Sequence, residues 1–442
     1  MRLPSQKEFD CSSTARITAE PLADSNSSMV VWYKWELLAL LWIAFFLHQG
    51  CRQIYNSVIP LLQSNLGLTN VQAGLVSSIF TLVYGLLVPI AGVAGDRFPR
   101  KWVIAASLFL FSSGTFLTGF STNLVMLVIL LSITTGGGEA FFYPSATSLL
   151  AQLHERTRAL ALGILQTGLY IGITVSGLLA GWIGQSYGWR QAFLVFGGAG
   201  LLWTGVVVLR LRNTPMPSPA GVCRVDRISL REVAAHVAGR PTIWLLSLAF
   251  GTMVFVNVGF VTWTPAFLHE RYGLSLAQAG FHSMVYHFIG AFVGVLVGSR
   301  IADNLARRRQ TIRLEMNFVG LLAGAPFIYW LGTSTTLTGS YLALGLFGLF
   351  RGFYDSNLFA SVYDLITPRL RSSATGLMLA FAFVVGSSAP TFLGLIKTKE
   401  GLGFGLSVLS GFYVFGALCV LVALRFFFRS DMLKMKTAHE NC

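Results

Sequence analysis

The sequence predicts an all-α membrane protein in which twelve transmembrane helices form two pseudo-symmetric six-helix bundles. Three observations lead to this fold class: an apolar composition, twelve long apolar stretches and an internal repeat. Hydrophobic residues make up 54% of the 442 residues and charged residues only 11%, and the mean hydropathy is +0.65. A soluble domain carries roughly 25% charged residues because its surface faces water. This chain therefore exposes its surface to lipid.

Each of the twelve apolar stretches is long enough to cross a bilayer, because a helix needs about 20 apolar residues to span the hydrocarbon core. One long polar break separates the first six from the last six. We divide the chain into an N-terminal segment (1–34), a first bundle (35–210), a linker (211–241), a second bundle (242–428) and a tail (429–442). The predicted helices are 35–62, 71–95, 102–121, 124–150, 158–184, 190–210, 242–268, 277–300, 313–332, 338–362, 370–396 and 403–428.

The basic residues predict the orientation, because Lys and Arg collect in cytoplasmic loops. If the N-terminus is cytoplasmic, 26 of the 32 Lys and Arg residues fall in inside segments and four in outside loops. We therefore expect a multi-pass protein of the cell membrane (a bacterial inner membrane or a plasma membrane) with both termini in the cytoplasm. The same segregation accounts for the net charge of +14, so no nucleic-acid partner is expected.

The two halves of the sequence repeat one another. The segment 67–74 (GLTNVQAG) opens the second predicted helix, and the segment 273–280 (GLSLAQAG) opens the eighth, 206 residues later. Internal repeats of this length are typical of transporters whose halves move about a central site. The loops that follow these helices correspond as well, with Asp96, Arg97 and Arg100 in the first half and Asp303 and Arg307 in the second.

The sequence carries no motif for an enzyme, a cofactor or a metal. It has no nucleotide-binding glycine loop, no HExxH and no GxSxG, which also argues against a pump with its own ATPase. The five cysteines show no CxxC spacing, so they predict neither a disulfide framework nor a zinc site. The first 30 residues are polar and do not read as a cleaved signal peptide, so we expect the first apolar helix to remain in the mature protein.

Five ionisable side chains lie inside the predicted helices, where each costs about 2.5–3.5 kcal/mol and is a functional hypothesis by default. Their distances from the helix starts, at 1.5 Å per residue, place four of them in a broad central layer of the membrane and Asp364 nearer the cytoplasmic end of its helix. They are Arg52 in the first helix, Glu139 in the fourth, and Arg351, Asp355 and Asp364 in the tenth.

The spacing of polar and ionisable residues within the first and fourth helices favours a cluster of side chains that point to one place in the protein. His48, Arg52 and Tyr55 recur at i, i+4 and i+7, so they share one face of the first helix. Glu139 and Tyr143 share a face of the fourth helix in the same way.

The segment 92–101 (GVAGDRFPRK) resembles the signature loop of the major facilitator superfamily, and chain length, helix count and the repeated loop extend the resemblance over nearly the whole chain. The resemblance implies that helices one, four, seven and ten line a central cavity. The charges found above fall on three of these four helices. It also implies that Asp96, Arg97, Arg100, Asp303 and Arg307 bias the cytoplasmic gate, where carboxylates and arginines meet helix ends and lipid phosphates.

Residues of the fourth predicted helix narrow the resemblance to two families within the superfamily. The run 137–140 (GGEA), followed by Tyr143 and Pro144, is similar to the anion:cation symporter family and to the Spinster-like family. These families place an Asp-Arg pair in the first helix, and the resemblance implies that Arg52 binds the substrate anion and that Glu139 takes part in proton coupling. The family aspartate is replaced here by Cys51, which puts the coupling stoichiometry in doubt.

We therefore predict a secondary active transporter, acting as a monomer, that moves a small organic anion such as a sugar acid with a proton as the coupling ion. Arg52 would hold a carboxylate through the parallel N–H donors of its planar guanidinium. Glu139 would bind and release the proton, and its protonation would free Arg52 from an ion pair with Glu139. The residues expected to bind substrate are Arg52, Tyr55, His48, Tyr143 and Arg351, and those expected to couple protons are Glu139 and Asp355.

Several alternatives stay open. The chain could carry a lysolipid in the manner of Spinster-like proteins, or be a sensor of the same fold that moves nothing. Arg351 and Asp355 are four apart and could simply neutralise each other, and Arg52 could form a permanent ion pair with Glu139. Packing roles are the alternative for His48 and the expectation for His282 and His287. Trp263 and Pro265, near the outer end of the seventh helix, are expected to be interface and kink residues first and cavity wall second.

Overall fold

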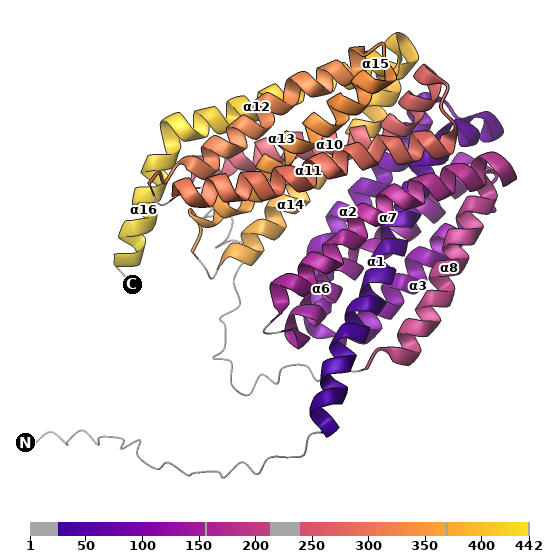
Figure 1. The fold of residues 1–442 in the computed structure, drawn as a ribbon, viewed down its shortest axis with the longest axis horizontal. Helices are drawn as coiled ribbons and strands as arrows, with labels where there is room; N and C mark the ends of the chain where they lie inside the picture. The colour runs from indigo at the N-terminus through magenta and orange to yellow at the C-terminus, as the bar shows by residue number, and fades with distance from the viewer. Residues whose placement is uncertain (1–24, 155–156, 213–238, 307, 368–369, 441–442) are drawn as a thin grey trace, which may run out of the picture.

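A computed structural model describes residues 25–154, 157–212, 239–306, 308–367 and 370–440. No strand occurs in these ranges, and nearly all of their residues are helical. Most of the linker, residues 213–238, lies outside the described residues. Two helical bundles stand side by side, the first drawn from indigo to magenta and the second from orange to yellow (Figure 1).

The described residues of the first bundle form six crossings. The fourth is assembled from short pieces because a π-helical segment interrupts the α-helix. The elements are α1 (Ser25–Leu66), α2 (Asn70–Arg97), α3 (Arg100–Thr118), the fourth crossing formed by α4 (Leu124–Leu127), η1 (Val128–Thr135), α5 (Gly136–Ala140) and α6 (Phe142–Leu153), then α7 (Arg158–Tyr187) and α8 (Trp189–Arg210).

The second bundle also crosses six times. Inside α15 the chain reverses at Gly401, whose φ of 85° suits only glycine, so α14 with the start of α15 makes one crossing and the rest of α15 the next. The elements are α10 (Pro241–Tyr272), α11 (Leu276–Ala306), α12 (Ile312–Thr333), α13 (Leu337–Tyr363), α14 (Arg371–Ser387), α15 (Ala389–Val422), η3 (Ala423–Phe427) and α16 (Phe428–Glu440).

The twelve crossings formed by the described residues confirm the predicted fold class. Ten stretches of the described chain are long and apolar enough to span a membrane, and one of them, Ser373–Lys434, contains two crossings. The one crossing outside these ten stretches is α13, the tenth along the chain, which carries Arg351 and Asp355. Several helices extend beyond their predicted bounds, since their polar ends continue in helical conformation past the hydrocarbon core.

The repeat in the sequence is a repeated turn in the structure. Gly67 and Gly273 precede the second helix of each bundle with φ values of 65° and 66°, a left-handed conformation that glycine adopts without strain. Each new helix then begins with a reciprocal cap, in which a hydroxyl accepts from a backbone N–H and a Gln side chain accepts from the capping residue. The capping pairs are Thr69 with Gln72 and Ser275 with Gln278.

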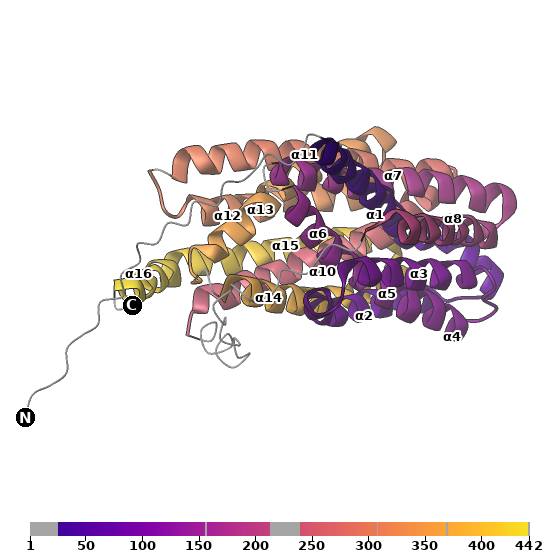
Figure 2. The ribbon, with the colours of Figure 1, turned by 90° about the horizontal axis from the view of Figure 1, so that it is seen from below.

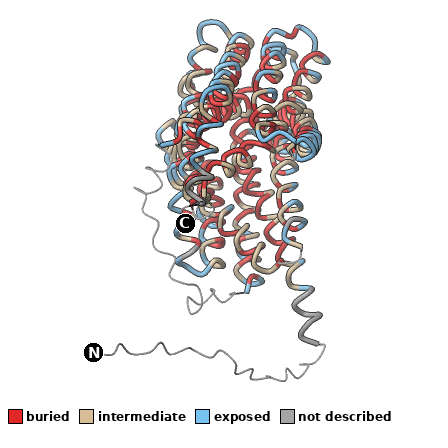
Figure 3. The backbone as a smooth tube through the Cα atoms, turned by 90° about the vertical axis from the view of Figure 1, so that its left-hand side faces the viewer, coloured by how far each residue is buried: buried red, intermediate tan, exposed pale blue. Residues whose placement is uncertain are grey.

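The outer surface of the molecule is apolar. Leu202 and Leu209 on α8 are 78% and 84% exposed, and Phe426 on η3 is 73% exposed. Buried residues concentrate inside the bundles, whereas exposed residues follow their outer faces and loops (Figure 3). An apolar exterior around helices that satisfy their own backbone hydrogen bonds is the arrangement that a bilayer requires.

The bundles meet at one end and diverge toward the other. Across their interface, α7 lies against α11, and α2 lies against α14 and α15 (Figures 1 and 2). Backbone approaches backbone closely at Gly177 with Gly280, at Gly181 with Leu276 and at Gly74 with Pro390. The hydrogen bonds between bundles that involve described residues join Asn70 to Thr398, Ser78 to Thr391 and Gln185 to Leu276.

All of these contacts lie toward the ends of α2, α7, α11 and α15 that are remote from the start of α1 and from α16. We call this the closed end, and we call the end with the start of α1 and with α16 the terminal end. The closed end is therefore sealed by packed glycines and hydrogen bonds.

Candidate functional site

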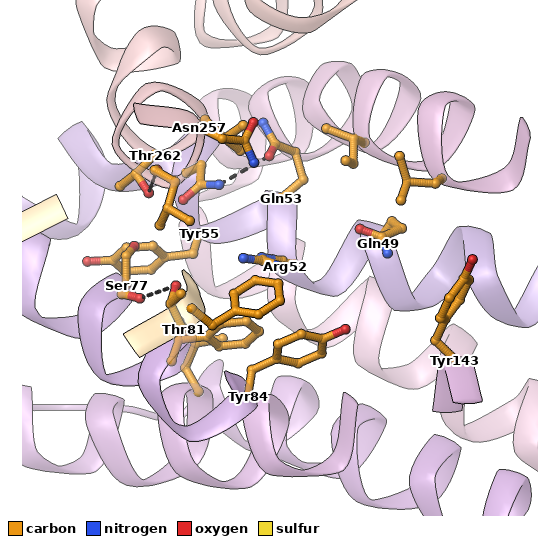
Figure 4. A pocket seen from close by; sticks show the side chains of 18 of the residues that line it. Gln49, Arg52, Gln53, Tyr55, Ser77, Thr81, Tyr84, Tyr143, Asn257 and Thr262 are labelled. Carbon is orange, nitrogen blue, oxygen red and sulfur yellow. Dashed lines mark hydrogen bonds between the residues drawn. The ribbon is translucent and has the colours of Figure 1, made fainter. Parts of the chain in front are cut away.

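A cavity of about 310 Å³ lies between the two bundles. Residues of α1, α2, η1, α6 and α7 line it from the first bundle, and residues of α10, α11, α13 and α14 line it from the second. Its wall combines aromatic rings with amides and hydroxyls. Figure 4 shows part of this wall, with Arg52 near the centre.

Arg52 points into this cavity without a counter-ion. Its guanidinium carbon lies 5.2 Å from the ring centre of Phe80 and 5.7 Å from that of Tyr84, both on α2. Among the described residues, Arg52 has neither an ion-pair partner nor a side-chain hydrogen-bond acceptor. Cation–π contacts hold a guanidinium without using its N–H groups in the ring plane. The donor fork of Arg52 therefore remains available for an anion.

Amides and hydroxyls surround Arg52 (Figure 4). Asn56 donates to the Oε1 atom of Gln53 over 3.1 Å, and the buried Nε2 atom of Gln53 has no acceptor among the described residues. An unsatisfied buried donor is costly, so it favours a ligand that supplies an acceptor. The other polar lining residues are Gln49, Ser77, Thr81, Gln166, Asn257 and Thr262.

The two predicted tyrosines also line the cavity. The hydroxyl of Tyr55 donates to the carbonyl of Ala73 over 2.7 Å and is buried, so its donor is already used within the first bundle. Tyr143 is 39% exposed and its ring centre lies 5.3 Å from that of Phe45. Tyr143 is thus the more accessible of the two rings.

Glu139 and His48 lie behind this wall, on the side that faces α3. The carboxylate of Glu139 is fully buried, and neither of its oxygens has a hydrogen-bond partner among the described residues. The Nε2 atom of His48 lies 3.9 Å from Oε2 of Glu139 and 3.1 Å from its backbone oxygen. The rings of Phe45, Phe111 and Phe142 surround His48.

This placement corrects two expectations. The ion pair between Arg52 and Glu139 is absent from the described structure, so Glu139 does not hold Arg52 in this conformation. His48 does not accompany Arg52 and Tyr55 into the cavity. The face of α1 that His48, Arg52 and Tyr55 share is wider than the part of α1 that lines the cavity. The edge of this face with His48 packs against α3.

Glu139 owes its position to the broken fourth crossing. The π-helical turn of η1 inserts an extra residue per turn just before the run of three glycines that begins α5. A Cβ atom at Gly138 would lie 2.7 Å from the backbone nitrogen of Phe111 on α3. The glycine run therefore lets α5 approach α3 closely and carries Glu139 into the protein interior. π-Helical turns often occur at functional sites.

Arg351 reaches the same cavity from α13, but its charge is compensated. Its Nε atom donates to Asp355 over 3.2 Å, and its Nη1 atom contacts Asn257 on α10 and lies 3.1 Å from Nε2 of His287 on α11. The ion pair between Arg351 and Asp355, weighed as an alternative above, is present. His287, expected to be a packing residue, contacts this arginine directly.

Trp263 is a packing residue in the described structure. It is fully buried, and its indole nitrogen donates to the carbonyl of Pro390 over 2.9 Å, joining α10 to α15.

The polar face of α2 was not predicted from the sequence. Ser77, Thr81 and Tyr84 recur at i, i+4 and i+7, and all three line the cavity. This spacing is the signal that places polar residues on one face of an apolar helix, and it identifies α2 as a wall of the site.

Of the loop residues at the terminal end, Asp303 and Arg100 have partners. Asp303 lies 3.9 Å from Arg313, which also binds Asp364 over 3.2 Å, so one arginine on α12 links α11 to the end of α13. Arg100 donates to Gln152 on α6 over 2.5 Å. Sequence analysis did not single out Arg313. Arg97 is exposed. The side chain of Asp96 and the whole of Arg307 lie outside the part of the chain that the structure describes.

Two six-helix bundles around a central cavity with a mixed aromatic and polar lining define a membrane transporter architecture, in which the bundles move about a site between them. The sequence model of the Major Facilitator Superfamily matches residues 41–391. The chain belongs to this superfamily of multi-pass membrane transporters, as the sequence predicted, and it is not an enzyme.

Named relatives cover most of the chain. A probable sulfoacetate transporter of Cupriavidus necator is 26% identical and aligns with 91% of this chain and 95% of its own. The D-galactonate transporter of Escherichia coli is also 26% identical, over 82% of this chain and 88% of its own. A bacterial homologue of the lysosomal transporter Spinster, solved in an inward-facing and unoccupied conformation, matches with a TM-score of 0.80 at 20% identity, covering 90% of this chain and 98% of that one.

Proposed function

We propose that the chain is a secondary active transporter that moves a small organic anion across the cell membrane by alternating access. One observation carries the proposal: Arg52 stands in the cavity between the bundles with an unpaired guanidinium. Arg52 is only partly exposed, so its charge is costly without a partner, and a bound anion would supply that partner. Similarity to transporters named for sulfoacetate and D-galactonate supports the same class of substrate.

The substrate would lie between Arg52 and the amides on both sides of the cavity. The planar guanidinium matches a carboxylate or sulfonate with two parallel hydrogen bonds. Gln53 and Asn56 on α1 and Asn257 on α10 would bind hydroxyl or carbonyl groups of the rest of the molecule. Because the groups come from both bundles, the substrate would draw the bundles together.

The conformation described above would be the inward-facing state. The closed end would be extracellular and the terminal end cytoplasmic, in line with the segregation of Lys and Arg along the sequence. Transport would then require the contacts at Gly177, Gly280 and Ser78 to separate while the terminal end closes.

Glu139 is our candidate for the proton carrier. Its carboxylate lacks hydrogen-bond donors in an apolar shell, where the neutral acid costs less free energy than the ion. His48, the ionisable neighbour whose nitrogen lies 3.9 Å from it, would accept or return the proton. Since Glu139 lies behind Arg52 and forms no pair with it, coupling would act through the position of α1 and not through release of an ion pair.

Uptake into proteoliposomes tests the proposal. Purified protein would be reconstituted and offered labelled D-galactonate, sulfoacetate and a lysophospholipid, with and without an imposed pH gradient. We expect accumulation of one of the acids, enhanced when the outside is acidic. Transport of the lysolipid alone would favour a lipid carrier, and binding without transport would favour a sensor. Either outcome would overturn the proposed function.

A further inference from the structure

The cavity carries one uncompensated positive charge. Of the described residues that line it, only Arg52 and Arg351 have formally charged side chains. Arg52 has no counter-ion, whereas Arg351 is paired with Asp355 over 3.2 Å. Glu139 does not enter this count, because it lies behind the wall, nearest His48, and outside ion-pair distance of Arg52.

The pairing of Arg351 is well supported by its surroundings. The side chain of Arg351 is 15% exposed, and its Nη1 atom meets Asn257 and His287. The two partners are one helical turn apart on α13, a spacing at which side chains meet without distortion. A substrate anion that sought Arg351 would have to displace Asp355 and leave that carboxylate unpaired, which is costly in a low-dielectric site.

We propose that Asp355 is a specificity-determining residue that restricts the transported substrate to monoanions by cancelling the charge of Arg351. This inference rests on the proposed function, in which Arg52 binds the anionic group. A second anionic group on the substrate would find no free cation in the cavity and would lose its hydration without compensation. The names of the relatives leave this point open, because galactonate carries one acidic group and sulfoacetate two.

The test compares acids that share a carbon skeleton and differ in charge. Galactonate has one carboxylate and galactarate has one at each end, and butyrate and succinate form a shorter pair. Apparent affinities would be measured at pH 7.5, where all four are fully ionised, by exchange in proteoliposomes held at zero membrane potential. Thermal stabilisation of the purified protein by each acid provides a second measurement that does not require transport.

The wild type should prefer the monoanion of a pair. In Asp355→Asn, Arg351 is released and can bind a second carboxylate, so the ratio of dianion to monoanion affinity should rise roughly 10- to 150-fold, as expected for one charge-assisted hydrogen-bonded contact. The double variant Arg351→Gln with Asp355→Asn restores a single positive charge and should return the ratio to the wild-type value. Asp355→Glu keeps the charge and should keep the preference.

Asp364→Asn is the matched control. Asp364 follows the last turn of α13 and pairs with Arg313 away from the cavity, so its loss should leave the affinity ratio unchanged. The inference is overturned if the wild type binds dianions as well as monoanions, or if Asp355→Asn folds and its ratio stays at the wild-type value. Failure of the proposed function has a different signature, because in that case no acid would bind at all, or Arg52→Gln would bind monoanions as tightly as the wild type.

Discussion

Arg52, Arg351 and Glu139 are all ionisable side chains at membrane depth, and the structure gives each a different environment. Arg52 rests on the rings of Phe80 and Tyr84 without a counter-ion. Arg351 is neutralised by Asp355. Glu139 is buried without a hydrogen-bond donor among the described residues. Because the free energy of a charge in a low-dielectric site depends on its partners, these environments support the proposal that Arg52 binds the anion and Glu139 the proton, while Arg351 forms a pair.

The first prediction concerns Arg52. Arg52→Lys keeps the charge but loses the bidentate fork, so we expect substrate affinity to fall by roughly 10- to 150-fold, equivalent to about 1.5–3 kcal/mol. The KM for uptake and thermal stabilisation by substrate would both report this loss. Arg351→Lys provides a comparison at an arginine that already has a carboxylate partner, where we expect a smaller effect. Normal affinity in Arg52→Ala would exclude Arg52 as the anion site.

The second prediction concerns Glu139. Glu139→Gln has the shape of the protonated acid and cannot release a proton. It should abolish accumulation driven by a pH gradient while preserving exchange of labelled for unlabelled substrate, because the loaded transporter can still reorient. Glu270→Gln, which alters a partly exposed carboxylate paired with Lys397, should leave both activities intact. Continued pH-driven accumulation by Glu139→Gln would show that proton coupling lies elsewhere.

At the scale of elements, the fourth crossing shows how a helix is modified to carry a polar group into the interior. The π-helical η1 and the three glycines of α5 occur in succession. The absence of side chains allows α5 to approach α3, and the hydroxyl of Ser107 donates to the carbonyl of Gly138 over 2.7 Å. The same close packing leaves little room for an added methyl group.

The third prediction tests this packing. A Cβ atom at Gly138 would lie 2.7 Å from a backbone nitrogen, so Gly138→Ala should lower stability by about 1–3 kcal/mol and impair pH-driven uptake by shifting Glu139. Gly163→Ala on α7 is the control. It meets nothing within 4 Å and should stabilise its helix by about 0.5–1 kcal/mol. Melting temperatures of the two variants should move in opposite directions, and equal melting temperatures would contradict the packing argument.

At the scale of the whole molecule, the hydrogen bonds that join the two bundles through described residues lie at the closed end. Ser78 and Thr391 approach within 2.7 Å between their hydroxyl oxygens, and Gly177 and Gly280 allow backbone contact. Hydroxyls and glycines hold the bundles by small, reversible interactions, which suits an interface that must open during transport.

The fourth prediction follows from that interface. The double variant Ser78→Cys with Thr391→Cys places two sulfurs within reach of a disulfide, so a membrane-permeable oxidant should lock the closed end and stop transport, and a reductant should restore it. In the described residues the native cysteines, Cys51 and Cys419, are both buried. Each single-cysteine variant is the control for effects of the oxidant other than the cross-link. An oxidised, cross-linked protein that still transports would contradict the requirement that this interface opens.

Composition and the internal repeat alone predicted the twelve crossings, the two bundles and the repeated segments that start at Gly67 and Gly273. These features depend on apolar length and on local turn chemistry, both of which are written in consecutive residues. The charged residues were also found from sequence, since a charge within an apolar stretch stands out. The sequence pointed to Arg52, Tyr55, Tyr143 and Arg351, and the structure lines one cavity with all four.

Only the tertiary structure decided which of these residues face one another. The sequence could not show that Arg52 lacks a counter-ion, that Glu139 turns toward His48 and α3, or that His287 contacts Arg351. Each of these facts depends on the rotation and spacing of helices that are far apart in the chain. Those in turn depend on glycine contacts and on the π-helical turn in the fourth crossing. Packing between helices, and not the periodicity of any one of them, therefore determined the electrostatics of the site.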